Sequence, residues 1–362
     1  MNVSLRWTVL ILLTAVAPLS IAADLSAAAI AAIDEAVAAA REEAHIPGLS
    51  VAVVRDGELI WAKGYGLADV ENEVAASEDT VYAWASVSKL VTAAGALKLV
   101  EQGAIDLHKP VQTWCPLFPE KPWPITPHHL LSHQSGIRHW RGFEETGNTR
   151  HFTGISQTFR SFKDDALLFE PGTNHEYSTP AFNVLGCVIE GASDQEFLEY
   201  MAAAVFEPAG MTKTGVDDAR AVIPNRADGY EYARDGLQRG ALHDTSIKVP
   251  GGGLAGPATD LARFAAALFQ GALLNDETRE LVWTQTALAD GTPTIRGYGC
   301  NVDDEKGRRV VWQIGGVPGF SGILYLVPEQ QAAVALLTNM QASPVFPLAS
   351  TIADAVLAAP SP

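Results

Sequence analysis

A serine and a lysine three residues apart stand at the start of an apolar segment, in the stretch Ser86-Val87-Ser88-Lys89. The segment from Ser88 to Val100 is predicted to form a helix with apolar residues on almost every side, and such a helix is normally buried. Residues three apart on a helix share one face, so both side chains point the same way. Burial favours the neutral form of a lysine, which can then serve as the base that activates a serine nucleophile. The alternative is a helix-capping serine beside a surface lysine.

Two further motifs have the residue types that would complete such a site. The stretch YST, Tyr177 to Thr179, lies in a polar turn just before a predicted helix, where a tyrosine can relay protons. The stretch QIGG, Gln313 to Gly316, ends a predicted strand, and its two glycines let a substrate approach the backbone. Each has a purely structural alternative, a buried tyrosine in the first case and a strand-end turn in the second.

Three other patterns resemble functional motifs but do not fit them. The stretch GGGLAG, 251–256, matches G-x-G-x-x-G, yet Pro250 stands where the preceding strand should be. His129 and His133 have helical spacing, but Leu130 occupies the glutamate position of a zinc-binding HExxH motif. The stretch GFSG, 319–322, is not G-x-S-x-G, which argues against an alpha/beta-hydrolase. We therefore expect neither a metal ion nor another cofactor.

Strand patterns at both ends of the chain, with helical patterns between them, define the predicted fold. A helix over 27–44 is followed by a hairpin, LSVAVVRDGELIWAKGYG, whose turn is Asp56-Gly57. Near the other end, the runs RRVVWQI, FSGILYLVP and AAVALLTNM are strand-like, and a last helix covers about 349–358. A sheet built from both ends, with a helical insertion, is the economical architecture. The predicted parts are 24–105 and 245–362 for an alpha/beta domain and 106–244 for a helical domain.

The composition limits the class of protein and its partners. The chain has 362 residues, of which 48% are hydrophobic, and this is enough for a sizeable core. A net charge of −17 argues against nucleic acid and anionic membranes as partners. Cys115, Cys187 and Cys300 are odd in number and far apart, so they are expected to pack in the core rather than form a disulfide framework.

The first 23 residues are predicted to be a secretory signal peptide. Arg6 precedes an apolar run from Trp7 to Ala17, and small residues follow that suit cleavage after Ala22 or Ala23. The run is short for a membrane span, and no later segment is long and apolar enough to be one. The alternative is an uncleaved anchor. We therefore expect a periplasmic or secreted protein without a membrane span after cleavage.

The order of these motifs resembles that of the serine beta-lactamase-like hydrolases, which include class C beta-lactamases, D-Ala-D-Ala carboxypeptidases and their esterase relatives. The chain is most similar to the branch of the mitochondrial serine beta-lactamase-like protein. The stretches that carry the resemblance are SVSKLVTAAGALKLVEQGAIDLHKPVQTWCPLFPEK, HHLLSHQSGIRHW, FKDDALLFEPGTNHEYST and GGGLAGPATDLARF. The resemblance implies an α+β fold, an antiparallel sheet flanked by helices with an inserted helical domain, and an active site between the two.

The resemblance also assigns roles to individual residues. It implies that Ser86 is the nucleophile, Lys89 its base or proton partner, and Tyr177 the second acid/base group. Gly316 would supply one oxyanion N–H and Ser86 the other, with Gln313 and Gly315 on the same strand facing the substrate. His133, in the segment LLSHQSGI, is expected to be structural.

Two positions depart from the wider family. Thr179 stands where class C enzymes have asparagine, and Gln313 stands where relatives have lysine or histidine. A neutral glutamine weakens the expectation of carboxylate binding, so neutral esters or internal peptide bonds are expected to be better substrates than penicillins. The predicted function is hydrolysis of a small ester, amide or peptide through an acyl-serine, as an esterase or peptidase. The alternatives are a true beta-lactamase and a non-catalytic binder of peptide or peptidoglycan. The sequence leaves the oligomeric state open.

Overall fold

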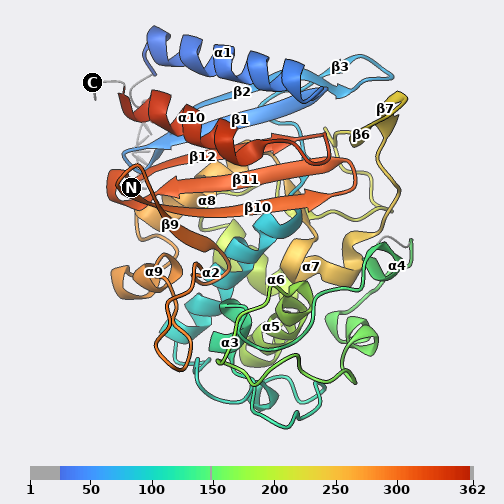
Figure 1. Cartoon of the computed structure of the whole chain (residues 1–362), viewed down its shortest axis with the longest axis vertical. Helices are drawn as coiled ribbons and strands as arrows, with labels where there is room; N and C mark the ends of the chain where they lie inside the picture. The colour runs from blue at the N-terminus through green and yellow to red at the C-terminus, as the bar shows by residue number, and fades with distance from the viewer. Residues whose placement is uncertain (1–24, 147–148, 359–362) are drawn as a thin grey trace, which may run out of the picture.

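A seven-stranded antiparallel sheet forms the centre of the molecule (Figure 1). The computed structural model describes residues 25–146 and 149–358, so the predicted signal peptide lies outside the described residues. The strand order is β3-β2-β1-β12-β11-β10-β9. The strands are β1 (Gly48–Arg55), β2 (Glu58–Asp69), β3 (Val74–Ala75), β9 (Asn301–Glu305), β10 (Arg308–Val317), β11 (Phe320–Val327) and β12 (Ala332–Thr338). Strands from the two ends of the chain therefore form one sheet, which confirms the predicted α+β fold class.

The β1–β2 hairpin and the β1–β12 pair join the two ends of the chain. Asp56 and Gly57 have φ values of 51° and 75°, the left-handed conformation that a tight two-residue hairpin turn requires. On its other side β1 pairs with β12, with Leu49 opposite Thr338. The predicted hairpin is thus confirmed, and β1 lies in the middle of the sheet, flanked on both sides by hydrogen-bonded strands.

Helices cover both faces of the sheet (Figure 1). Alternate residues of β1 point to opposite faces, as the twofold period of a strand requires. Val51 and Val53 belong to the core formed with α1 (Ala27–Glu43) and α10 (Val345–Ala358). Ala52 and Val54 belong to the larger core on the other face, to which α8 (Ala258–Phe269) and the helical part of the molecule contribute.

The helical part lies on the α8 side of the sheet, and α2 (Ser88–Glu101) runs through it (Figure 1). The other elements on this side are η1 (Ala85–Val87), η2 (Val111–Thr113), α3 (Pro127–Leu131), α4 (Phe143–Thr146), η3 (Ile155–Ser161), α5 (Thr179–Ser193), α6 (Phe197–Met201), η4 (Ala202–Phe206), η5 (Thr245–Lys248), α7 (Val249–Gly252) and α9 (Asp276–Val282). The remaining elements are β4 (Tyr82–Ala83), β5 (Gly215–Val216), β6 (Tyr230–Ala233), β7 (Gly236–Arg239), β8 (Leu254–Gly256) and η6 (Pro328–Gln330). The predicted domain boundaries at 105 and 244 stay a prediction.

Within the described ranges, none of the helices combines the length and the apolar character that crossing a bilayer requires.

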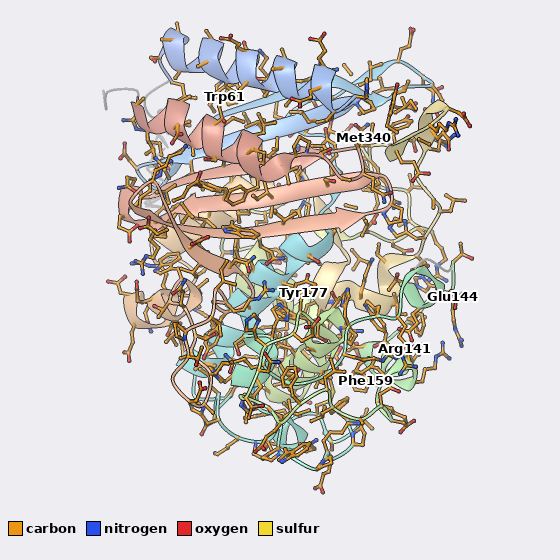
Figure 2. All side chains as sticks on the ribbon, viewed as in Figure 1. Trp61, Arg141, Glu144, Phe159, Tyr177 and Met340 are labelled. Atoms are coloured by element: carbon orange, nitrogen blue, oxygen red, sulfur yellow. A yellow bond between two sulfur atoms is a disulfide. The ribbon has the colours of Figure 1, made fainter. Side chains whose placement is uncertain are left out.

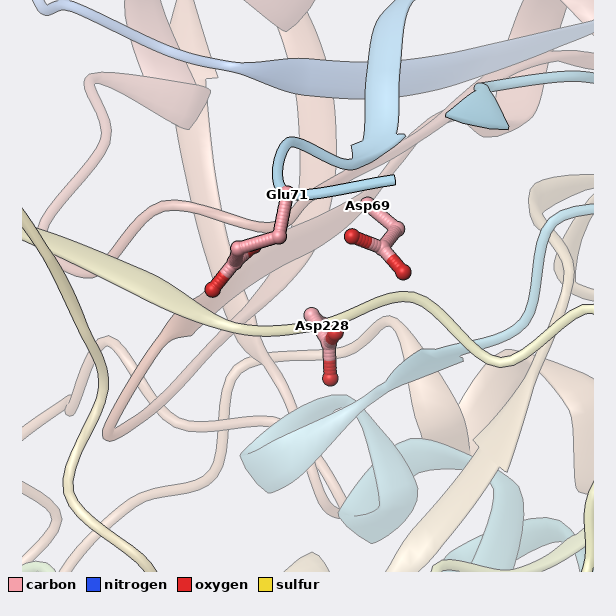
Figure 3. A group of neighbouring side chains, drawn as sticks. All are labelled: Asp69, Glu71 and Asp228. Atoms are coloured by element: carbon pink, nitrogen blue, oxygen red, sulfur yellow. The ribbon is translucent and has the colours of Figure 1, made fainter. Parts of the chain in front are cut away.

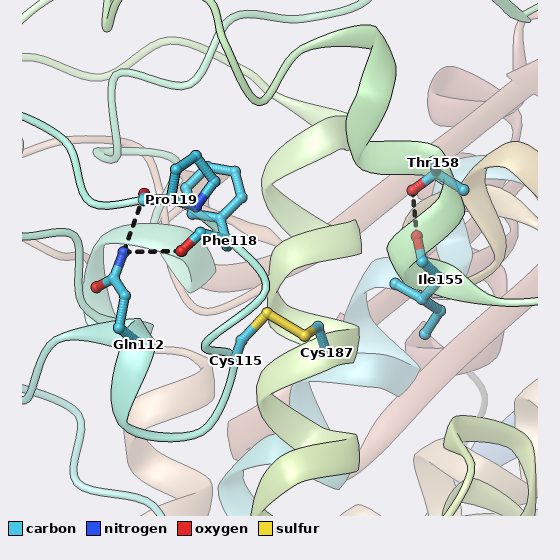
Figure 4. The surroundings of a disulfide bond; sticks show 7 residues. All are labelled: Gln112, Cys115, Phe118, Pro119, Ile155, Thr158 and Cys187. Atoms are coloured by element: carbon cyan, nitrogen blue, oxygen red, sulfur yellow. Dashed lines mark hydrogen bonds between the residues drawn. A yellow bond between two sulfur atoms is a disulfide. The ribbon is translucent and has the colours of Figure 1, made fainter.

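A disulfide bond joins Cys115 to Cys187, which corrects the expectation that both cysteines are free core residues (Figure 4). It ties the loop after η2 to the middle of α5, across 72 residues of sequence. The sequence did not reveal it because the pairing of distant cysteines depends on how the chain folds. Gln112, within η2, donates from Nε2 to the carbonyl oxygen of Pro119 at 3.1 Å (Figure 4). Cys300 is free and buried, as expected.

Candidate active site

Ser86 lies in a tight turn immediately before α2. The turn is the 3-10 segment η1, and Ala85 within it has a φ of 48°, a strained conformation for a residue with a side chain. Ser88 holds the turn in place, because its Oγ donates to the carbonyl oxygen of Ala85 at 2.7 Å and accepts from the backbone N–H of Leu254 at 3.2 Å. Ser88 is therefore structural, and the turn presents the neighbouring Ser86 to a cleft.

Lys89 is fully buried at the first turn of α2, as its apolar surroundings predict. Its Nζ lies 3.1 Å from Ser86 Oγ and 3.0 Å from Thr179 Oγ1, and it also donates to the carbonyl oxygen of Gly251. Burial lowers the pKa of Lys89, Tyr177 acts against this, and the Arg296 charge lowers the pKa further. The net direction is downward, toward the neutral amine that can accept a proton.

Tyr177 approaches Ser86 from a different part of the chain. Its Oη donates to Ser86 Oγ at 2.6 Å. Burial by itself raises the pKa of Tyr177, but the Lys89 charge and the hydrogen bonds to its hydroxyl outweigh burial, so the pKa lies below its usual value. Arg296 adds a second cation, with its guanidinium 5.6 Å from the centre of the tyrosine ring. Figure 2 shows Tyr177 among the side chains on the helical side of β10.

The segment around His133 fixes the position of Tyr177. The backbone N–H groups on both sides of Tyr177 donate to His133, that of Glu176 to its carbonyl oxygen at 2.9 Å and that of Ser178 to its Nδ1 at 3.2 Å. The ring of His133 also packs against the tyrosine ring, with 4.6 Å between their centres. Ser178 then caps α5 by accepting from the N–H of Ala181 at 3.1 Å. His133 is thus a buried structural residue in this fold, in keeping with the expectation.

The side chains of Ser86, Lys89 and Tyr177 can exchange one proton. The Gly251 carbonyl only accepts, so one N–H of Lys89 points at it in either protonation state. A charged Lys89 with an ionised Tyr177 leaves the tyrosine oxygen to accept the proton of Ser86. A neutral Lys89 with an intact Tyr177 leaves the amine lone pair to accept it instead. Both arrangements use the same atom pairs with the two hydrogen bonds of Ser86 reversed, and both agree with lowered pKa values for Lys89 and Tyr177.

The end of β10 forms the opposite wall of the site. Gly316 lines the cleft, and a Cβ there would meet no atom within 4 Å. A Cβ on Gly315 would instead come within 2.1 Å of the carbonyl oxygen of Trp84 and 3.0 Å of the nitrogen of Ser86. Only glycine therefore lets β10 lie so close to the turn that carries Ser86. An oxyanion site made by the N–H groups of Gly316 and Ser86 stays a prediction.

Gln313 does not line the cleft. Its side chain is 4% exposed, and its Nε2 donates to the carbonyl oxygen of Ile314 at 3.0 Å. Gly315 is likewise covered by η1 rather than open to a ligand. Of the residues expected on this strand, Gly316 is the one that reaches the cleft, and a direct substrate contact by Gln313 or Gly315 stays a prediction.

The cleft beside Ser86 has a volume of about 330 Å³. Its walls come from η1, the segment from His139 to Thr146, the start of α5, the η5–α7 region and the end of β10. The lining residues are Ala85, Ser86, His139, Trp140, Gly142, Thr146, Tyr177, Thr179, Lys248, Gly251, Gly252, Gly316, Val317 and Pro318. The cleft therefore lies between the sheet and the helical part and is open to a small acyl substrate.

Several lining residues have no role assigned from the sequence, among them His139 and Lys248, and Thr179 was noted only as part of the YST stretch. Thr179 accepts a hydrogen bond from Lys89, so it supports the lysine from the position where class C enzymes have asparagine. His139 accepts from the N–H of Thr179 through Nδ1 at 3.2 Å, and burial and the nearby Lys89 and Lys248 charges lower its pKa to about 4. Lys248 lies at the end of η5. The stretch RHW and the lysine before GGG were the only local signals for these positions.

Among the described residues, one group of acidic side chains is close enough together to hold a metal ion, and none of its members lines the cleft (Figure 3). The carboxylate oxygens of Asp69, Glu71 and Asp228 lie within 4.8 Å of one another. Arg239 pairs with two of them, with its Nε 2.8 Å from Glu71 and its guanidinium also against Asp228. The arginine already balances part of their charge, so the group gives no reason to assign a metal ion.

The family model described as Beta-lactamase matches residues 33–358, and the chain therefore belongs to the beta-lactamase family. It is a beta-lactamase-related serine hydrolase.

Particular relatives span several activities. The chain is 28% identical to the serine beta-lactamase-like protein LACTB, mitochondrial, of Bos taurus. The aligned region covers 82% of this chain and 71% of that protein. It is 34% identical to the esterase EstB of Burkholderia gladioli over 53% of each chain. The octameric penicillin-binding protein homologue from Pyrococcus abyssi has a similar structure, with a TM-score of 0.77, 25% identity and coverage of 91% of this chain and 76% of that one.

Proposed function

We propose that this protein is an exported hydrolase that cleaves an ester or amide bond through an acyl-Ser86 intermediate. The observation that carries the proposal is the contact of Ser86 Oγ with both Tyr177 Oη, at 2.6 Å, and Lys89 Nζ, at 3.1 Å, at the wall of the cleft. A nucleophile within hydrogen-bond reach of two groups with shifted pKa values is the usual arrangement of covalent catalysis. A non-catalytic binder would have no need of this arrangement.

The reaction we propose has two steps. In the first, Ser86 Oγ attacks the carbonyl carbon while its proton passes to Lys89 or Tyr177. The N–H groups of Ser86 and Gly316 stabilise the oxyanion. The same proton then goes to the leaving alcohol or amine as the C–O or C–N bond breaks. In the second step water attacks the acyl-serine, loses a proton by the reverse path, and releases the acid and free Ser86.

The test is covalent labelling with a neutral fluorophosphonate, followed by intact mass and peptide mapping. One adduct on Ser86 is expected, and Ser86→Ala should abolish it while the protein stays folded. Ser193→Ala is a matched control, because Ser193 lies at the end of α5 with its Oγ bonded to the carbonyl oxygen of Ile189. Labelling that survives in Ser86→Ala, or that maps to Ser321, would overturn the assignment. A matched ester and amide then distinguish esterase from peptidase activity.

Export is supported by two features of this chain. The first is the signal-like segment 1–23, and the second is the Cys115–Cys187 disulfide, since disulfides persist in oxidising compartments. A periplasmic or secreted protein is therefore proposed, although the bovine relative is named as mitochondrial. N-terminal sequencing of the protein from the periplasmic fraction should begin at Ala23 or Asp24. Protein that begins at Met1, or that stays in the cytoplasm, would contradict export.

A further inference from the structure

The charge of the cleft differs in sign from that of the whole protein. Among the described residues that line the cleft, none is acidic, and Lys248 is the one with a charged side chain at neutral pH. His139 is neutral there because its pKa is about 4. Lys89 adds a buried amine just behind Ser86. In a chain with a net charge of −17, a cleft without carboxylates and with a cation at its wall favours an anionic ligand.

Lys248 is held close to the nucleophile by Gly252. A Cβ on Gly252 would lie 3.5 Å from Cδ of Lys248 and 3.6 Å from the carbonyl carbon of Ala85. The stem of Lys248 and the residue before Ser86 therefore pack against the same glycine. The ammonium group of Lys248 takes part in none of the hydrogen bonds or ion pairs found within 25–146 and 149–358. A half-buried cation without such a partner can offer all of its N–H groups to a ligand.

Four titratable side chains interact electrostatically with Lys248. They are Lys89, His139, Asp217 and His243. Asp217 forms its ion pair with Arg226 rather than with Lys248. Burial, and then the Lys89 charge, lower the pKa of Lys248 to about 8. The side chain is therefore mostly charged at pH 7 and loses its charge as the pH rises through about 8.

We propose that Lys248 binds a carboxylate that the substrate carries near its scissile bond. This inference rests on the proposed function, because it names the class of substrate that the Ser86 site takes. It differs from the expectation of a preference for neutral substrates, which rested on the neutral side chain of Gln313 and on the net charge of −17. Gln313 is buried and is not among the lining residues of the cleft, whereas Lys248, at the end of η5, is one of them. A charge-assisted hydrogen bond from an ammonium to a carboxylate is about twice as strong as a neutral one.

The test compares two fluorophosphonate probes that differ only in a short terminal arm, which ends in a carboxylate in one and in a carboxamide in the other. Both form the same bond to Ser86, so the ratio of their labelling rates at low concentration isolates recognition of the charge. In the wild type the carboxylate probe should react faster. Lys248→Met keeps the length of the stem against Gly252 and should lower the ratio about tenfold or more, whereas Lys248→Arg should keep most of it.

The wild-type ratio should also fall as the pH rises through about 8, and it should be flat over this range in Lys248→Met. Lys109→Met is the matched loss of one charge, because Lys109 is exposed and its Nζ lies 3.9 Å from the carboxylate of Asp106. It should leave the ratio unchanged. If neither probe labels the wild type, the proposed function itself fails. If both label it and Lys248→Met has the wild-type ratio, the proposed function stands and the role of Lys248 is overturned.

Discussion

Replacing Tyr177 with phenylalanine removes a single oxygen atom from the proposed site. That oxygen lies 2.6 Å from Ser86 Oγ, and its loss leaves the ring packing against His133 and His139 in place, at 4.6 and 5.4 Å between ring centres. One lost hydrogen bond lowers the free energy of unfolding by about 1 kcal/mol. A positioned acid or base contributes about a hundred- to ten-thousand-fold in rate, which is about 3 to 5 kcal/mol of activation free energy. Tyr177→Phe is therefore expected to stay folded and to be labelled at least about a hundredfold more slowly.

The same variant should shift the pH dependence of the residual labelling. Burial lowers the pKa of Lys89, and Tyr177 acts in the opposite direction. Without the tyrosine oxygen the pKa of Lys89 falls further, so the amine is neutral down to a lower pH. If the neutral amine of Lys89 takes the Ser86 proton, the acid limb of the rate profile moves to lower pH in Tyr177→Phe.

The assay is the rate of labelling by the neutral fluorophosphonate from pH 5 to 10, read by intact mass, together with urea unfolding. Tyr200→Phe is the matched control, because its hydroxyl is buried, donates to the carbonyl oxygen of Gly95 at 2.9 Å, and does not line the cleft. It should label at the wild-type rate. A Tyr177→Phe rate within about threefold of the wild type, or an acid limb that moves upward, would refute the role given to Tyr177.

Three further predictions concern the residues around the site and the disulfide. Lys89→Met should label at least about a hundredfold more slowly. Because burial lowers the pKa of Lys89 in the folded state, the free energy of unfolding of the wild type rises as the pH rises toward the ordinary pKa of lysine. Urea unfolding at pH 7 and at pH 10 should therefore show a smaller rise in the variant than in the wild type. Gly315→Ala should lower the unfolding free energy by about 1 to 3 kcal/mol, because its Cβ would lie 2.1 Å from the Trp84 oxygen, whereas Gly316→Ala, with open space around it, should unfold at nearly the wild-type urea concentration. The double variant Cys115→Ala, Cys187→Ala should lose about 4 kcal/mol, because the bond closes a long loop, and an unchanged urea midpoint would contradict the bond.

Features that depend on neighbouring residues were predictable from the sequence. The Ser86–Lys89 contact follows from helical spacing, and the burial of Lys89 follows from apolar residues on every side of α2. The Asp56-Gly57 turn and the alternating pattern of β1 define a hairpin before any partner is known. The strands at both chain ends also indicated one sheet, because neither end has enough strands to bury a sheet face by itself. Local periodicity and turn chemistry carry this information, and they act over a few residues.

The tertiary structure decided which residues that are far apart in the sequence come into contact. Tyr177 meets Ser86 across 91 residues of sequence, and the Gly251 carbonyl meets Lys89 across 162. Family resemblance pointed to the first contact, but nothing in the sequence pointed to the second. The Cys115–Cys187 pair was missed, and only the fold shows that Gln313 is buried and that Lys248 lines the cleft. The sequence determines which residue types are available and the local elements that carry them. Which of them share a cleft depends on how those elements pack, because packing sets distances that spacing along the chain does not.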